Sequence, residues 1–166
     1  DVLPFSKNGS VLVACSGADN LGLLMGGWSL AWQGTSSSDA DGARGSTVLR
    51  GLQRQSGCQS CIHHSPTGEA AAGEHVSVAV AVVTEAPYAE GFGDAERSPV
   101  PLSEADAACI ARLHERDPAL PIVLVTVSGR AMDVAKYVNG ASGVAAVVAS
   151  WLPGSEGGDG IAEVLY

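Results

Sequence analysis

The sequence predicts an α/β protein: a three-layer α/β/α sandwich around a mostly parallel sheet of about six strands. Two observations predict this class. Val-rich stretches with little polar alternation recur along the chain, and apolarity on both faces is typical of parallel strands covered by helices on each side. Helical segments separate these stretches, and strands that alternate with helices form doubly wound sheets with right-handed crossovers.

Four stretches are predicted as strands, at residues 10–14, 75–84, 121–127 and 143–150. Each one enters a polar or Gly-rich turn at its carboxyl end, at residues 15–20, 84–85, 128–130 and 150–154. Ligands of open α/β sheets bind beyond the carboxyl ends of the strands. We therefore expect the four turns to converge on one rim that carries the functional site.

Three helices are predicted between and after the strands. Ser46 is predicted to cap a helix that carries the apolar residues of 48–52. Ser103 followed by Asp106 resembles a capping box at the start of a second helix. A shorter helix is predicted at 133–138, ending at the Asn-Gly pair that follows it, as a left-handed C-cap requires.

Length and charge limit the possible partners. A chain of 166 residues fits one domain with a single core, and the stretch 161–166 reads as an unfinished helix, which predicts a longer parent polypeptide. The formal net charge of −9 disfavours nucleic acid and anionic lipid. No run approaches the roughly 18 uninterrupted apolar residues of a membrane span. We therefore expect neither a nucleic acid nor a membrane as partner.

The four cysteines are predicted to play structural roles only. Cys15 and Cys109 lie in apolar or helical settings, which favour free, buried, small hydrophobic side chains. Cys58 and Cys61 form a Cys-x-x-Cys pair, which can supply zinc ligands or close a disulfide. A second ligand pair is hard to find, so a strand and loop without metal is favoured there. No metal or cofactor is expected.

The segment 84–94 is the first candidate for chemistry. It places two carboxylates and two aromatic side chains directly after the most apolar predicted strand, with Glu85 nearest to the strand. A carboxyl group at the mouth of an apolar layer is desolvated, and this suits it to donate a proton near neutral pH. From spacing alone, a solvated glutamate in a loop is the default interpretation.

The second candidate is the segment 26–34. The paired glycines Gly26 and Gly27 predict a close approach of the backbone to a neighbouring group, and the indole of Trp28 offers the flat apolar face on which a sugar ring stacks. Alternatively, Trp28 and Trp32 lie four residues apart and form one helical stripe in the core. We favour this second interpretation for Trp32 and leave both open for Trp28.

These segments also carry a resemblance that spans nearly the whole chain. Motifs at residues 11–22, 26–34, 85–94, 128–130 and 151–157 resemble, in the same order, the second domain of family 3 glycoside hydrolases. The similarity is to the exo-acting β-glucosidase and β-glucan glucohydrolase branch. Departures from the family pattern are the apolar stretch 23–25, where polar residues are usual, and Ala131, where Pro is common.

The resemblance implies a retaining exo-acting β-glucosidase or β-glucan glucohydrolase that hydrolyses O-glycosyl bonds. In this family a (β/α)8-type barrel supplies the nucleophilic Asp, and the domain represented here supplies the acid/base carboxylate. The motif match gives that role to Glu85. It makes Trp28 an aromatic wall of the sugar site, with Glu90, Asp94 and Asp19 as further substrate-binding residues.

The resemblance also implies the partners. A β-glucoside or β-glucan oligosaccharide is the expected substrate, and the N-terminal barrel is the expected partner domain. We expect an extracellular or periplasmic location, although no motif in the sequence decides it. An alternative of a different class is a non-catalytic carbohydrate-binding or interaction module derived from the same domain.

Overall fold

A computed structural model describes residues 2–38, 44–69, 75–95, 97–138 and 142–166. Within these ranges five strands form one parallel sheet in the order β2-β1-β3-β4-β5. The strands are β1 (Val11–Ala14), β2 (Ile62–Ser65), β3 (Val78–Thr84), β4 (Ile122–Val127) and β5 (Val144–Trp151). The predicted fold class is confirmed, with five strands described where about six were expected.

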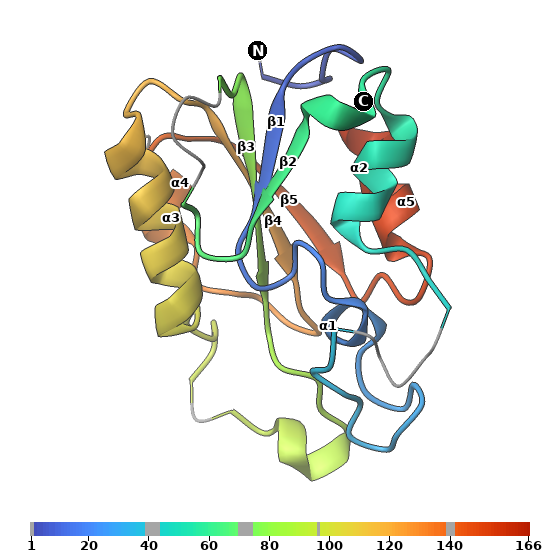
Figure 1. Ribbon diagram of the computed structural model, residues 1–166. Helices are drawn as coiled ribbons and strands as arrows, with labels where there is room; N and C mark the ends of the chain where they lie inside the picture. Colours follow the sequence, from blue (N-terminus) through green and yellow to red (C-terminus); the bar gives the residue numbers. More distant parts are fainter. Residues whose placement is uncertain (1, 39–43, 70–74, 96, 139–141) are drawn as a thin grey trace.

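Helices cover both faces of the sheet (Figure 1). One layer holds α2 (Val48–Gln55) and α5 (Gly157–Leu165), and the other holds α3 (Glu104–Arg116) and α4 (Ala135–Val138). Three shorter elements are α1 (Leu21–Met25) and the 3-10 turns η2 (Gln59–Cys61) and η3 (Glu90–Gly93). None of the helices in the described ranges is long and apolar enough to cross a membrane.

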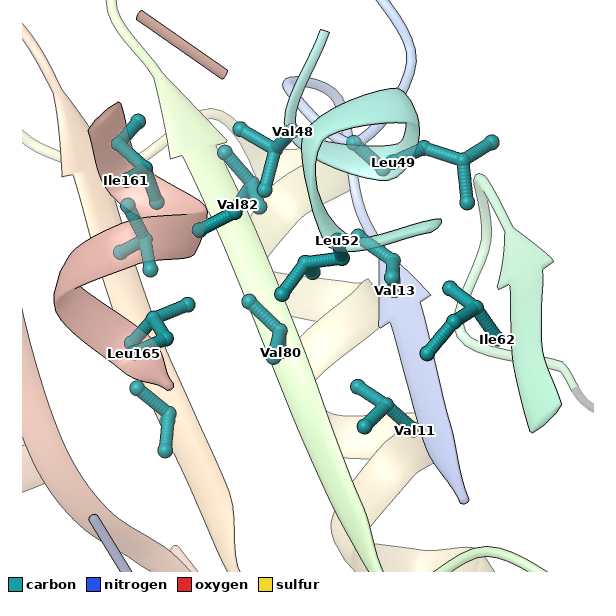
Figure 2. Packing of buried hydrophobic residues seen from close by; sticks show 14 of the residues in the cluster. Val11, Val13, Val48, Leu49, Leu52, Ile62, Val80, Val82, Ile161 and Leu165 are labelled. Atoms are coloured by element: carbon teal, nitrogen blue, oxygen red, sulfur yellow. The ribbon is translucent and has the colours of Figure 1, made fainter. Parts of the chain in front are cut away.

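Two apolar clusters, one on each face, hold the layers together. Every residue of β1, β3 and β4 is buried, as expected for central strands of a covered parallel sheet. Figure 2 shows side chains of α2 and α5, among them Leu52 and Leu165, packed onto β1 and β3, where Val80 lies. The two helices α2 and α5 approach closely at glycines: a Cβ added to Gly51 would lie only 2.1 Å from the carbonyl oxygen of Gly158.

The helix starts agree with the sequence in part. Thr47, not Ser46, caps α2, because the Ser46 hydroxyl is used elsewhere: it lies 3.4 Å from the Thr47 carbonyl and accepts a hydrogen bond from Arg54. Ser103 caps α3 as predicted. The Asp106 side chain bonds to Ser16 and Thr84 and so does not complete a capping box. The predicted C-cap of the short helix lies outside the described residues.

The prediction of free thiols is wrong for Cys15 and Cys109, whereas for Cys58 and Cys61 the structure has the disulfide that the sequence left open. Cys15 and Cys109 are each 1% exposed but form a disulfide, because the turn after β1 lies directly against α3. Cys58 and Cys61 form a second disulfide across the turn η2. Neither pair could be assigned from spacing alone, since two cysteines can be bridged only where the fold brings their Cα atoms within about 7 Å.

Candidate functional site

The loops that follow the strands meet at the carboxyl edge of the sheet. In Figure 1 the strand arrows point toward this edge, where α1 and η3 lie. Backbone hydrogen bonds join the strand ends there: Glu85 N–H donates to the Val127 carbonyl at 2.9 Å, and Ser128 N–H donates to the Trp151 carbonyl at 2.9 Å. We call this edge and its loops the carboxyl rim.

A cavity of about 260 Å³ opens in the carboxyl rim. Its walls come from the segment after α1, the segment after β3, the turn after β4 and Leu152 after β5. Glu85, Trp28 and Glu90 all line it. The structure thus brings these three predicted site residues into one pocket, although they come from two separate segments of the chain.

Glu85 is the most enclosed carboxylate of this pocket. Its side chain is 15% exposed, and Oε1 lies 2.7 Å from Nε of Arg130. This is an ion pair without aligned hydrogen-bond geometry. Oε2 is buried and has no hydrogen-bond partner among the described residues. A buried acceptor without a donor is costly, so this oxygen is a candidate to accept a hydrogen bond from a donor outside the described residues.

Arg130 is itself held by an aromatic ring. Its guanidinium carbon lies 4.3 Å from the centroid of the Tyr88 ring, a cation–π contact that fixes the cation beside Glu85. Gly129 makes room for this arrangement, because a Cβ there would lie 2.4 Å from the Tyr88 hydroxyl oxygen. The Ser-Gly-Arg turn therefore orients the carboxylate of Glu85 from the β4 side.

The two loops that carry Trp28 and Glu85 are held together by a close backbone approach and by the side chain of Gln33. A Cβ on Gly27 would lie 2.0 Å from the Tyr88 carbonyl oxygen, which confirms the predicted close approach at the paired glycines. The Gln33 side-chain amide accepts a hydrogen bond from Ala89 N–H at 2.9 Å and donates to the Ala89 carbonyl at 3.3 Å. Trp28 is thereby held at a fixed place relative to Glu85.

The aromatic side chains of the carboxyl rim face outward. Trp28 is 70% exposed, Phe92 is 73% exposed, and Trp32 is 46% exposed. The prediction of a core position for Trp32 is wrong: α1 ends before Gly26, whose φ is 78°, so the segment 26–34 is not a helix and presents no helical stripe. Trp32 packs instead against Trp28 and Phe92, with ring centroids 6.4 and 5.4 Å apart.

The remaining predicted residues lie outside the cavity walls. Asp94 is exposed in the loop after η3. Asp19 faces α2: its Oδ1 accepts a hydrogen bond from the Thr47 hydroxyl at 2.7 Å and lies 3.9 Å from Nε of Arg50. These contacts give Asp19 a structural role between the turn after β1 and the start of α2.

Three residues of the site lie in the motif segments but received no role from the sequence: Arg130, Tyr88 and Gln33. A usable signal existed for Arg130, because it is a cation in a turn predicted to lie at the same edge as Glu85. Gln33 carried no such signal, since a bidentate contact to a distant backbone cannot be read from spacing.

An enclosed carboxylate beside an exposed indole, at the carboxyl edge of a parallel sheet, fits a domain that acts on carbohydrate. The chain belongs to a specific family of this class, because residues 1–166 match the glycosyl hydrolase family 3 C-terminal domain.

Relatives of known name agree with this assignment. The chain is 31% identical over 182 residues to the lysosomal beta glucosidase of Dictyostelium discoideum, an alignment that covers 99% of this chain and 21% of that protein. The crystal structure of the exo-1,3/1,4-beta-glucanase from a Pseudoalteromonas species superposes with a TM-score of 0.83 at 36% identity, covering 99% of this chain and 20% of that one.

A beta-glucosidase from Listeria innocua, solved in complex with isofagomine, shares the fold with a TM-score of 0.71 at 19% identity, over 98% of this chain and 22% of that one. The chain thus spans about a fifth of the length of each of these relatives.

Proposed function

We propose that this chain is the acid/base domain of a retaining, exo-acting β-glucosidase or β-glucan glucohydrolase, with Glu85 as the acid/base. The observation that carries the proposal is the state of the Glu85 carboxylate: one oxygen is paired with Arg130 and the other is buried without a partner in a cavity that Trp28 also lines. A sugar hydroxyl that enters the cavity would donate to this oxygen, and in the protonated carboxyl the same oxygen would donate to the glycosidic oxygen.

In the proposed reaction Glu85 acts twice. It first donates a proton to the glycosidic oxygen of the leaving group while an Asp of a barrel domain attacks the anomeric carbon. It then takes a proton from the water that releases the sugar. The two carboxyl groups of a retaining pair stand about 5 to 5.5 Å apart, so the barrel would have to approach the carboxyl rim closely.

The surroundings of Glu85 suit the leaving-group side of such a pocket. Trp28 offers a large exposed ring face for stacking, and we assign it to the wall of the sugar site. Glu90, also a cavity wall, and the exposed Asp94 are proposed as supporting polar contacts to sugar hydroxyls. Asp19 is assigned to the scaffold, because its carboxylate already binds the Thr47 hydroxyl.

We further propose that the protein works in an oxidising compartment, extracellular or periplasmic. The support is the pair of disulfides, Cys15–Cys109 and Cys58–Cys61. Disulfides persist in such compartments and are rare where thiols are kept reduced.

The test compares two leaving groups in the full-length enzyme, meaning the protein in which this domain is joined to the proposed barrel. For Glu85→Gln, kcat/KM on laminaribiose, whose leaving group needs a proton, should fall by about 10² to 10⁴-fold. The fall on 2,4-dinitrophenyl β-glucoside, whose leaving group needs none, should be much smaller. Steady-state rates on both substrates measure this.

Glu163→Gln is the matched control, because Glu163 is an exposed glutamate on α5. It should leave both rates unchanged. Equal losses on both substrates for Glu85→Gln, or no loss at all, would remove Glu85 from the acid/base role. A full-length protein that binds laminari-oligosaccharides but hydrolyses neither substrate would instead support the non-catalytic module.

A further inference from the structure

Asp106 is a buried carboxylate that the proposed reaction does not use. It lies in the first turn of α3, and its residue exposure is 1%. Three donors converge on it: Ser16 N–H reaches Oδ1 at 3.0 Å, the Ser16 hydroxyl reaches Oδ2 at 2.9 Å, and Thr84 N–H reaches Oδ2 at a longer 3.4 Å. Donors alone suit an ionised carboxylate, which only accepts hydrogen bonds.

These hydrogen bonds lead to the acid/base residue. Thr84 is the last residue of β3 and directly precedes Glu85. Its N–H is bound to Asp106, and its hydroxyl lies 2.8 Å from the Ser16 hydroxyl. On the other side, Glu85 N–H donates to β4 at the Val127 carbonyl. The backbone at 84–85 is therefore held from two directions, by β4 and by the Asp106–Ser16 pair.

A covalent link also joins α3 to the end of β1. The disulfide Cys15–Cys109 connects the residue before Ser16 to the residue three positions after Asp106. Residues three apart on a helix face the same side. The first turns of α3 are thus tied to the end of β1 by one covalent bond and by the polar contacts of Asp106.

Asp106 is not needed for the other tasks of α3. Ser103 already caps the helix by accepting the Asp106 N–H at 3.1 Å. Ile110 and Leu113, both buried, already pack the helix onto the sheet. Within the described residues, the hydrogen bonds of the Asp106 carboxylate go to Ser16 after β1 and to Thr84 at the end of β3, both at the carboxyl rim.

We propose that Asp106 is a positioning residue for Glu85. Through Thr84 and Ser16 it fixes the backbone from which the Glu85 side chain enters the cavity, without touching the cavity itself. This inference rests on the proposed role of Glu85 as acid/base. It assigns a function to a residue on a helix that forms no part of the sugar site.

The test is Asp106→Asn in the full-length enzyme. The amide keeps the size of the side chain, but its NH₂ group replaces one carboxylate oxygen. A donor then faces Ser16 or Thr84, which are themselves donors to Asp106. The ratio of kcat/KM on laminaribiose to kcat/KM on 2,4-dinitrophenyl β-glucoside should fall by about 10-fold to 100-fold, because a displacement of about 1 Å costs that much. This ratio does not depend on how much enzyme is folded, so lost stability alone leaves it unchanged.

Two further variants make the result decisive. Ser103→Ala weakens the same helix at its cap and should lower both rates equally. Ser16→Ala removes one donor to Asp106 and the contact to Thr84, and should lower the ratio in the same direction by a smaller factor. Ser16→Ala decides the question if Asp106→Asn does not fold.

An unchanged ratio in the folded Asp106→Asn variant, while Glu85→Gln lowers it, would overturn the positioning role and leave the proposed function standing. An unchanged ratio in Glu85→Gln itself would overturn both. The two failures are therefore distinguishable by one series of measurements.

Discussion

The interior of the sheet and its carboxyl rim differ in how far their apolar side chains are buried. In the interior, every residue of the three central strands is buried and apolar contacts fill both faces. On the carboxyl rim, Trp28, Phe92 and Leu152 expose more than half of their surface. Exposed apolar side chains gathered at one edge mark a surface that meets a ligand or another domain.

Backbone strain is distributed in the same unequal way. The described non-glycine residues with positive φ all lie at or beside the ends of strands or in the loops of the carboxyl rim: Cys15, Trp28, Leu30, Glu90 and Trp151. Each such conformation costs about 1 to 3 kcal/mol and is kept only where the surroundings impose it. The buried interior therefore supplies the stability that holds the strained rim in place.

The largest expected effect concerns the disulfide that joins the carboxyl rim to α3. Its cysteines are 94 positions apart, so the crosslink removes much entropy from the unfolded chain, and Cys15→Ala with Cys109→Ala should lower the free energy of unfolding by about 4 to 5 kcal/mol. The matched variant, Cys58→Ala with Cys61→Ala, opens a loop between cysteines with a sequence separation of 3. It should lower the free energy of unfolding by about 2 kcal/mol. Urea unfolding of the four-cysteine chain and both variants measures this. Equal losses would show that loop length does not set the stabilisation.

A smaller effect separates the interior from the rim directly. Leu124, fully buried in β4, leaves a cavity when changed to Ala, and Leu124→Ala should lower the free energy of unfolding by about 3 kcal/mol. Phe92→Ala removes a larger side chain that is 73% exposed and should change it by less than about 0.5 kcal/mol. The same urea unfolding experiment measures both. If Phe92→Ala lowered the free energy of unfolding as much as Leu124→Ala, the interior and the carboxyl rim would not differ in their contribution to stability.

The sequence predicted the interior better than the rim, for a physical reason. Runs such as residues 78–84 are apolar on both faces, and local pattern is enough to identify a covered parallel strand. Glu85 and Trp28 were predicted as site residues because each follows a local signal, a strand end or a glycine pair. Their meeting in one cavity depends on contacts between segments about 60 residues apart, such as Gln33 with Ala89.

The errors have the same origin. Asp106 fits a local capping pattern, but its side chain finds three donors from distant strand ends. Cys15 and Cys109 fit the pattern of buried thiols, but the fold places their Cα atoms 5.7 Å apart. Trp32 fits a helical stripe, but the chain turns at Gly26 and exposes it. In each case a tertiary contact or turn overrode the local pattern.

The most direct measurement is chemical rescue of Glu85→Ala in the full-length enzyme with 2,4-dinitrophenyl β-glucoside and azide. Without its acid/base the enzyme should still form the glycosyl intermediate from this activated substrate, and azide, which needs no general base, should release it. We expect faster turnover with azide and a β-glucosyl azide product, identified by NMR. An absence of rescue, or an α-glucosyl azide product, would contradict the assignment of Glu85 as the acid/base.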